Sequence, residues 1–156
     1  MAKFAENTSV SVEKSRAEIE TLIVRYGATS TAFMNGPGRA MILFEAKGRR
    51  IMFELPLPDR EEKRFQRDGR GSMRSPDKRA EAWEQACRQR WRALALVIKA
   101  KLEAVESGIT SFEDEFLAHV VMPDGKTVAT HIKPRIAEAY EHGSMLPLLP
   151  APTRPQ

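Results

Sequence analysis

The sequence predicts an α+β fold in which a three-stranded antiparallel meander packs on one long helix, with an N-terminal helix and two C-terminal helices completing the core. Apolar residues between positions 77 and 106 recur every three or four residues, which is the spacing of a buried helix face. Three earlier runs, at 30–34, 39–46 and 49–55, are β-branched, aromatic or alternating, and glycine-containing turns separate them. A chain of 156 residues is the size of one domain.

The chain begins with a polar segment, residues 1–10, that lacks periodicity and is predicted to be a flexible arm ahead of a single domain at 11–143. Residues 12–26 have apolar side chains at helical spacing and charged ones opposite, and Gly27 provides a left-handed stop. The first ordered element is therefore predicted to be an amphipathic helix.

In the predicted meander, a tight turn at Lys47 and Gly48 joins the second and third strands. Alternation places one apolar set on a single face of the sheet: Ala40, Ile42, Phe44, Ile51, Phe53 and Leu55. The opposite face would carry Met41, Leu43 and Met52, which are too apolar to be wholly exposed. We therefore expect something to cover part of that face.

A long basic loop is predicted at 59–76, because Pro56 and Pro58 end the third strand and the following residues have no periodicity. The long helix is then predicted near residues 77–106. Ser75 or Asp77 can serve as its N-terminal cap, and Gly108 ends it. Trp83, Cys87 and Trp91 lie on its apolar stripe, so we interpret both tryptophans as core residues.

Two shorter helices are predicted after the long one. The first begins at Thr110 or Ser111, and the second runs from Val128 past Pro134, where a kink or restart is expected. Residues 144–156 contain four prolines and form a tail that is either extended over the surface or disordered.

Charge is unevenly distributed along the chain, although the net charge is only +4. Residues 39–101 contain 17 basic and 9 acidic side chains, whereas the residues after 101 contain 4 basic and 8 acidic ones. This segregation favours a surface that faces a polyanion, although a pattern that serves only solubility would produce the same split.

The residue types needed for most enzymatic and metal sites are missing or badly spaced. The one cysteine excludes an intramolecular disulfide framework, and the three histidines match no local zinc pattern. No phosphate-binding glycine loop, nucleophile motif or dinucleotide fingerprint is present, so the sequence predicts a non-enzymatic protein without metal or cofactor. The sequence has no signal peptide or membrane span, which predicts a cytoplasmic location.

The strongest candidate site is a set of basic side chains centred on the loop, because guanidinium groups match phosphate oxygens and a basic loop contacts a nucleic-acid backbone without reading bases. The alternative is that the loop is a solvated charge run, since acidic residues are interspersed in it. The candidate phosphate contacts are Arg49, Arg50, Arg60, Lys63, Arg64, Arg67, Arg70, Arg74, Lys78, Arg79, Arg88 and Arg92.

Five stretches are distinctive when taken together: VEKSRAEIE at 12–20, RYGA at 25–28, FELPLPD at 53–59, AWEQACRQRWRAL at 82–94 and FEDEFL at 112–117. They resemble a family of small uncharacterised proteins carried by tailed bacteriophages and prophages. The resemblance covers most of residues 10–149 and implies the cytoplasm of an infected or lysogenic bacterial host. It transfers no catalytic residue.

Two functions remain open from the sequence. The first is binding of nucleic acid, preferably single-stranded DNA with weak sequence preference, in phage DNA replication or recombination. The second is a protein-interaction module, such as an accessory factor or an inhibitor of a host protein. It would use the apolar sheet face or the proline-rich tail to bind a partner or to form a homo-oligomer.

Overall fold

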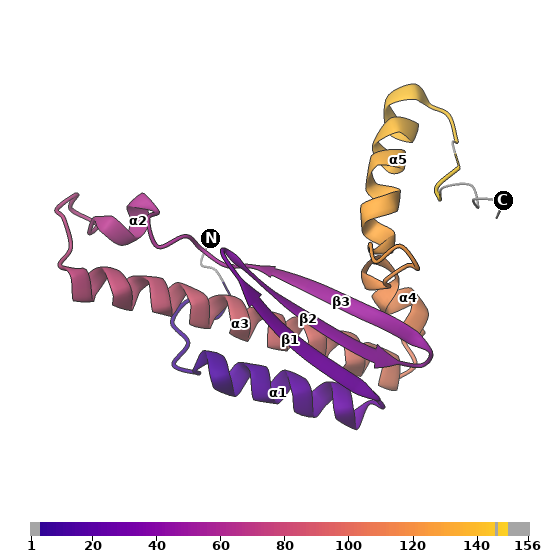
Figure 1. The fold of residues 1–156 in the computed structure, drawn as a ribbon, viewed down its shortest axis with the longest axis horizontal. Helices are drawn as coiled ribbons and strands as arrows, with labels where there is room; N and C mark the ends of the chain where they lie inside the picture. Colours follow the sequence, from indigo (N-terminus) through magenta and orange to yellow (C-terminus); the bar gives the residue numbers. More distant parts are fainter. Residues whose placement is uncertain (1–3, 146, 150–156) are drawn as a thin grey trace.

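The computed structural model describes residues 4–145 and 147–149, and it confirms the predicted α+β architecture (Figure 1). One antiparallel sheet has the strand order β1-β2-β3, and α1 and α3 cover one of its faces. The elements are α1 (Val12–Arg25), β1 (Ser30–Gly36), β2 (Arg39–Ala46), β3 (Arg49–Pro56), α2 (Lys63–Gln66), α3 (Pro76–Glu106), α4 (Phe112–Phe116), the 3-10 helix η1 (Leu117–His119) and α5 (Val128–His142).

Helices α1 and α3 begin at serine caps. Ser11 Oγ accepts a hydrogen bond from the Lys14 amide at 3.1 Å, and Ser75 Oγ accepts one from the Lys78 amide at 3.4 Å. Pro76 occupies the first turn of α3, where its missing N–H costs nothing. With 31 residues, α3 is about 46 Å long and spans the whole body.

The strands pair in the register that alternation predicts. Phe44 lies opposite Ile51, and Ile42 lies opposite Phe53, so the apolar sets of β2 and β3 share one face. The turn between these strands has positive φ at both Lys47 (53°) and Gly48 (71°), which is the geometry of a two-residue hairpin.

The core lies between the sheet and the helices. Ile42, Ile51, Ile98 and Phe116 have no measurable exposure, and α3 contributes Trp91 and Cys87 to the buried set, as predicted. Trp83 differs from the prediction, because it is only half-buried. Its indole N–H donates to the Pro58 carbonyl at 2.8 Å, so this ring is anchored at the edge of the core.

The segment at 59–76 is more ordered than its lack of periodicity predicted. It contains α2, followed by a short hairpin in which Arg67 bridges Met73. Phe65 is 4% exposed and fixes the segment to the body. The expectation of a loop without secondary structure is wrong, because one buried aromatic and a backbone hairpin replace the missing periodic pattern.

The C-terminal part continues from α3 through α4 and η1 to α5. Val120 forms an isolated bridge with Ile51, which attaches this part to the free edge of β3. Helix α5 is one element through Pro134, where the sequence predicted a kink or a restart. It stands away from the body, on the side of the sheet opposite α1 (Figure 1). Much of the proline-rich tail, residues 146 and 150–156, lies outside the described residues.

The described part of the N-terminal arm, which the sequence predicted to be flexible, is hydrogen-bonded to α3. Gln85 donates to the carbonyls of Glu6 and Thr8, both at 3.0 Å, and Gln89 donates to the Phe4 carbonyl at 3.1 Å. The signal that sequence reasoning missed is this pair of glutamines one turn apart on α3.

Candidate nucleic-acid interface

The structure divides the predicted basic residues among three places along α3. Eight of them gather around the N-terminal end of α3: Arg60, Lys63, Arg64, Arg67, Arg70, Arg74, Lys78 and Arg79. Arg88 and Arg92 lie further along the helix, and Arg49 and Arg50 lie at the opposite end, beside the turn between β2 and β3. The twelve residues therefore do not form one continuous surface. We call the group of eight the basic end.

The carboxylates of the basic end mostly organise its backbone. Asp68 Oδ1 accepts hydrogen bonds from the amides of Arg70 and Ser72, both at 2.9 Å. Asp59 Oδ1 accepts one from the Glu61 amide at 2.9 Å. These side chains act as turn caps, so their charges fold the loop and do not pair with its guanidinium groups.

Consequently several cations of the basic end have no acidic partner. Lys63, Arg70 and Arg74 form no ion pair within the described residues. Arg67 donates to the Gly71 carbonyl at 2.7 Å, and Arg79 donates to Gln66 Oε1 at 2.8 Å, so both heads bond to neutral groups. These charges remain available to an anionic ligand.

Two cations of the basic end are paired with acids. Arg64 lies 2.6 Å from Glu62 and over the ring of Phe65, 4.5 Å from its centroid. Lys78 lies 3.6 Å from Glu81 on the exposed side of α3. Surface pairs of this kind contribute little to stability, but they lower the availability of the two charges.

Trp83 connects the basic end to a cavity. The Arg60 guanidinium lies 4.0 Å from the indole centroid, which is cation–π geometry. Trp83 also lines a cavity of about 520 Å³ together with Trp91, Cys87, Arg16 and Arg88. Burial raises the pKa of the Cys87 thiol, so this sulfur is a neutral part of the wall.

The other predicted residues are already engaged. Arg92 pairs with Glu18 and joins α3 to α1. Arg88 donates to Gln85 Oε1, the amide side chain that holds the N-terminal arm. Arg49 lies 3.1 Å from Glu113, and Arg50 lies 2.9 Å from Glu45.

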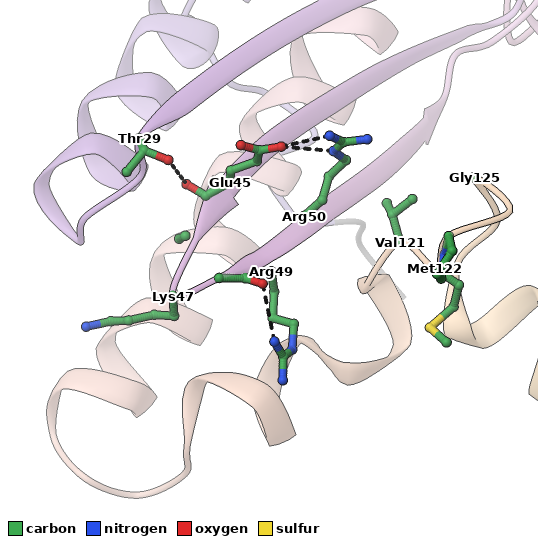
Figure 2. Close-up of a pocket in the computed structure, with 11 residues that line it drawn as sticks. Thr29, Glu45, Lys47, Arg49, Arg50, Val121, Met122 and Gly125 are labelled. Atoms are coloured by element: carbon green, nitrogen blue, oxygen red, sulfur yellow. Dashed lines mark hydrogen bonds and ion pairs between the residues drawn. The ribbon is translucent and has the colours of Figure 1, made fainter.

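Arg49 and Arg50 border a second cavity, of about 500 Å³, between the β2-β3 turn and residues 121–125 (Figure 2). Figure 2 shows the Arg50 guanidinium turned onto Glu45 and the Lys47 side chain extending away from the other lining residues. The Arg49 head also donates to the Gly48 carbonyl at 3.2 Å. The cations around this cavity do not converge, so it is a poor anion site.

Comparisons with family models, with curated proteins and with solved structures return no match to this chain. Within residues 4–145 and 147–149, no cluster of three or more His, Cys, Asp or Glu side chains is placed to hold a metal ion. No helix in the same part of the chain combines the length and apolarity that a membrane span requires.

Proposed function

We propose that this chain is a non-enzymatic protein that binds single-stranded DNA, with weak sequence preference, through the basic end. The proposal rests on the different contacts that the acidic and the basic side chains of the loop make. Asp59 and Asp68 are used by backbone amides, while Lys63, Arg70 and Arg74 have no described acidic partner. A loop ordered in this way holds cations in place for phosphates before any ligand arrives.

The position of the loop strengthens its attraction for phosphate. It precedes the first turn of α3, where the positive end of the helix dipole favours negative charge. Contacts of this kind act on the nucleic-acid backbone, so they contribute affinity without selecting a base sequence.

The cavity beside Trp83 favours a single strand over a duplex. Its wall includes the half-buried Trp83 ring and the guanidinium groups of Arg16 and Arg88, and unpaired bases stack on surfaces of this type. Arg16 is held over the rings of Phe33 and Trp91, 5.2 and 5.5 Å from their centroids. Bases in a duplex are already stacked and would not reach such a wall.

The resemblance to phage and prophage proteins supplies the biological setting of the proposal, which is phage DNA replication or recombination. A protein-interaction module remains a second candidate. It is favoured by the sheet face that carries Met41, Leu43 and Met52, because none of the described helices covers that face.

The decisive experiment measures binding of a fluorescent oligodeoxynucleotide at several salt concentrations. We expect Lys63, Arg70 and Arg74 together replaced by Ala to weaken binding and to reduce the slope of log affinity against log salt by about 0.7 for each phosphate that is no longer neutralised. The matched control replaces Arg49, Arg50 and Arg135, which lowers net charge equally but removes side chains that are ion-paired elsewhere. Equal losses in the two triple variants, or no binding by the wild type at low salt, would refute the proposal.

A further inference from the structure

The sheet face turned away from α1 and α3 carries a compact apolar patch. Ala32, Leu43 and Met52 lie side by side across the three strands, and Met34 pairs with Met41 in the next outward-facing row. Met34 is 47% exposed, and the two β2 residues and Met52 are half-buried. We call these five side chains the outer patch.

Ion pairs border the outer patch on both sides along the strands. Arg50 and Glu45 lie 2.9 Å apart at one end, and Arg39 and Glu54 lie 3.3 Å apart at the other. An apolar centre with a charged rim is the usual anatomy of a protein–protein interface.

The C-terminal half of α5 carries a second apolar surface, which no other element contacts within the described residues. Val128, Ile132, Ile136 and Tyr140 recur every four residues on one face. The first two pack against the core, whereas Ile136 is 44% and Tyr140 is 89% exposed. The stripe that anchors the start of α5 therefore continues into solvent.

We propose that two copies of this chain form a dimer in which α5 of each copy lies on the outer patch of the other. The proposal goes beyond nucleic-acid binding and does not depend on it. A helix on a sheet face is one of the few stable layer arrangements, and each copy offers one helix and one open face. Exchange of the same element in both directions gives a closed twofold dimer.

The shape of the chain suits this exchange. Helix α5 rises on the side of the sheet opposite α1, so α5 and the outer face of the sheet form the two sides of an open corner (Figure 1). Two such corners interlock about a twofold axis. The ten residues of α5 beyond Ile132 are about 15 Å long, which is enough to cover the two rows of the outer patch, roughly 7 Å apart along the strands.

The contact has the size of a reversible dimer interface only if it forms twice. A three-stranded face about 15 Å long covers roughly 200 Å², so one helix–sheet contact buries roughly 400 Å² over both surfaces. Two reciprocal contacts bury roughly 800 Å², which is the size of a weak, reversible interface.

The base of α5 is fixed in a way that favours a second copy over the chain's own sheet. The Val121 amide donates to the Arg50 carbonyl at 2.8 Å, and the Val128 amide donates to the Val120 carbonyl at 2.9 Å. Folding α5 back onto its own outer patch would require these bonds and the Ile51–Val120 bridge to break. A partner's helix reaches the patch at no such cost.

Sedimentation of the purified chain tests the proposal, with a folding check by circular dichroism. We expect the wild type to sediment as a dimer of the 17.6 kDa chain. Ile136→Lys on α5 and Leu43→Glu on the outer patch should each raise the dimer dissociation constant by at least about tenfold, because each buries an unpaired charge. Tyr140→Lys, at a more exposed position, provides a second α5 variant if Ile136→Lys misfolds.

An equimolar mixture of Ile136→Lys and Leu43→Glu chains makes the test specific. A heterodimer of the two retains one wild-type contact and places the new Lys against the new Glu in the other, so the mixture should recover dimers. The control is Ile109→Lys, an 80% exposed apolar position after α3, which should leave the dimer intact. A monomeric wild type, a dimer that survives Ile136→Lys, or a mixture that stays monomeric overturns the proposal.

Discussion

The two ends of α3 carry similar charged side chains but use them differently. At the C-terminal end, Arg49 pairs with Glu113 at 3.1 Å and Lys101 pairs with Glu115 at 3.0 Å, so cations and acids neutralise one another. At the N-terminal end, Asp68 accepts two backbone amides instead, and Arg70 and Arg74 have no described acidic partner. The same residue types therefore pair with one another at the C-terminal end of α3, which we call the closed end. At the N-terminal end they leave cations available to an anion.

The difference arises from what the local backbone needs. Around the C-terminal end, the backbone is mostly satisfied by helices and by the β2-β3 ladder, so acidic side chains are available to cations. Between residues 59 and 75 only the four residues of α2 are helical, and the turns need acceptors for their free N–H groups. The net charge of a sequence segment does not show whether a carboxylate pairs with a cation or accepts a hydrogen bond from a backbone amide.

The largest expected effect is at the closed end. Phe116 has no exposure and packs against Phe44, Phe53 and Phe112, with ring centroids 6.0, 6.1 and 4.8 Å away. We expect Phe116→Ala to lower the free energy of unfolding by about 3–5 kcal/mol, measured by urea denaturation. DNA affinity of the folded fraction should not change, because the basic end lies at the other end of α3.

Leu117→Ala serves as the control for that substitution. Leu117 is the next residue and is 48% exposed, so its truncation should cost less than about 1 kcal/mol. If Phe116→Ala also altered DNA affinity at concentrations of urea where it is folded, the two ends would be coupled and the comparison above would fail.

Much of the fold was predictable because its signals are local. The serine cap at Ser75, the turn at Lys47 and Gly48, and the apolar stripe through Cys87 and Trp91 each depend on residues within a few positions of one another. The structure confirms all of these.

The parts that sequence reasoning missed depend on long-range contacts or on a single residue. Arg49 and Glu113 are 64 positions apart, so no local pattern indicates their pairing. The stacking of Arg60 on Trp83 likewise depends on how the loop returns to α3. One usable signal was Phe65, a large apolar residue within a charged run, which marks the point where the segment is anchored.

A smaller effect tests whether Asp68 acts on DNA binding as a turn cap or through its charge. Asp68→Ala removes one negative charge, which by long-range attraction alone would strengthen DNA binding. Because Asp68 organises the loop, we expect the opposite, namely weaker binding. We also expect local destabilisation of about 1–2 kcal/mol, detected as faster amide hydrogen exchange at Arg70 and Ser72.

Glu61→Ala is the matched control for this charge change. Glu61 lies in the same segment and is exposed, and its side chain forms no hydrogen bond or ion pair within the described residues. Its removal should strengthen binding slightly. If both variants bound DNA more tightly, Asp68 would be acting by its charge and not as a turn cap.

The smallest effect concerns pH and the closed end. His119 stacks on Phe53 with a centroid distance of 4.0 Å, and burial, with smaller effects of Lys101 and Lys133, lowers the pKa of this imidazole below its ordinary value of 6.5. The unfolded chain then takes up the proton at a higher pH than the folded one. Stability contributed by the neutral ring is therefore fully present above pH 6.5 and decreases as the pH falls toward the folded-state pKa.

We expect His119→Gln to remove this part of the pH dependence, so that its melting temperature falls less than that of the wild type between neutral pH and pH 5. The Asp124 carboxyl does not interfere, because its pKa is held below the ordinary 3.8, mainly by the Lys126 amide, and its effect begins only at more acidic pH. His142→Gln, at the exposed end of α5, should keep the wild-type profile. Parallel melting profiles for wild type and His119→Gln would mean that the ring is not buried as a neutral group, and the closed end would then be more open to water than its packing indicates.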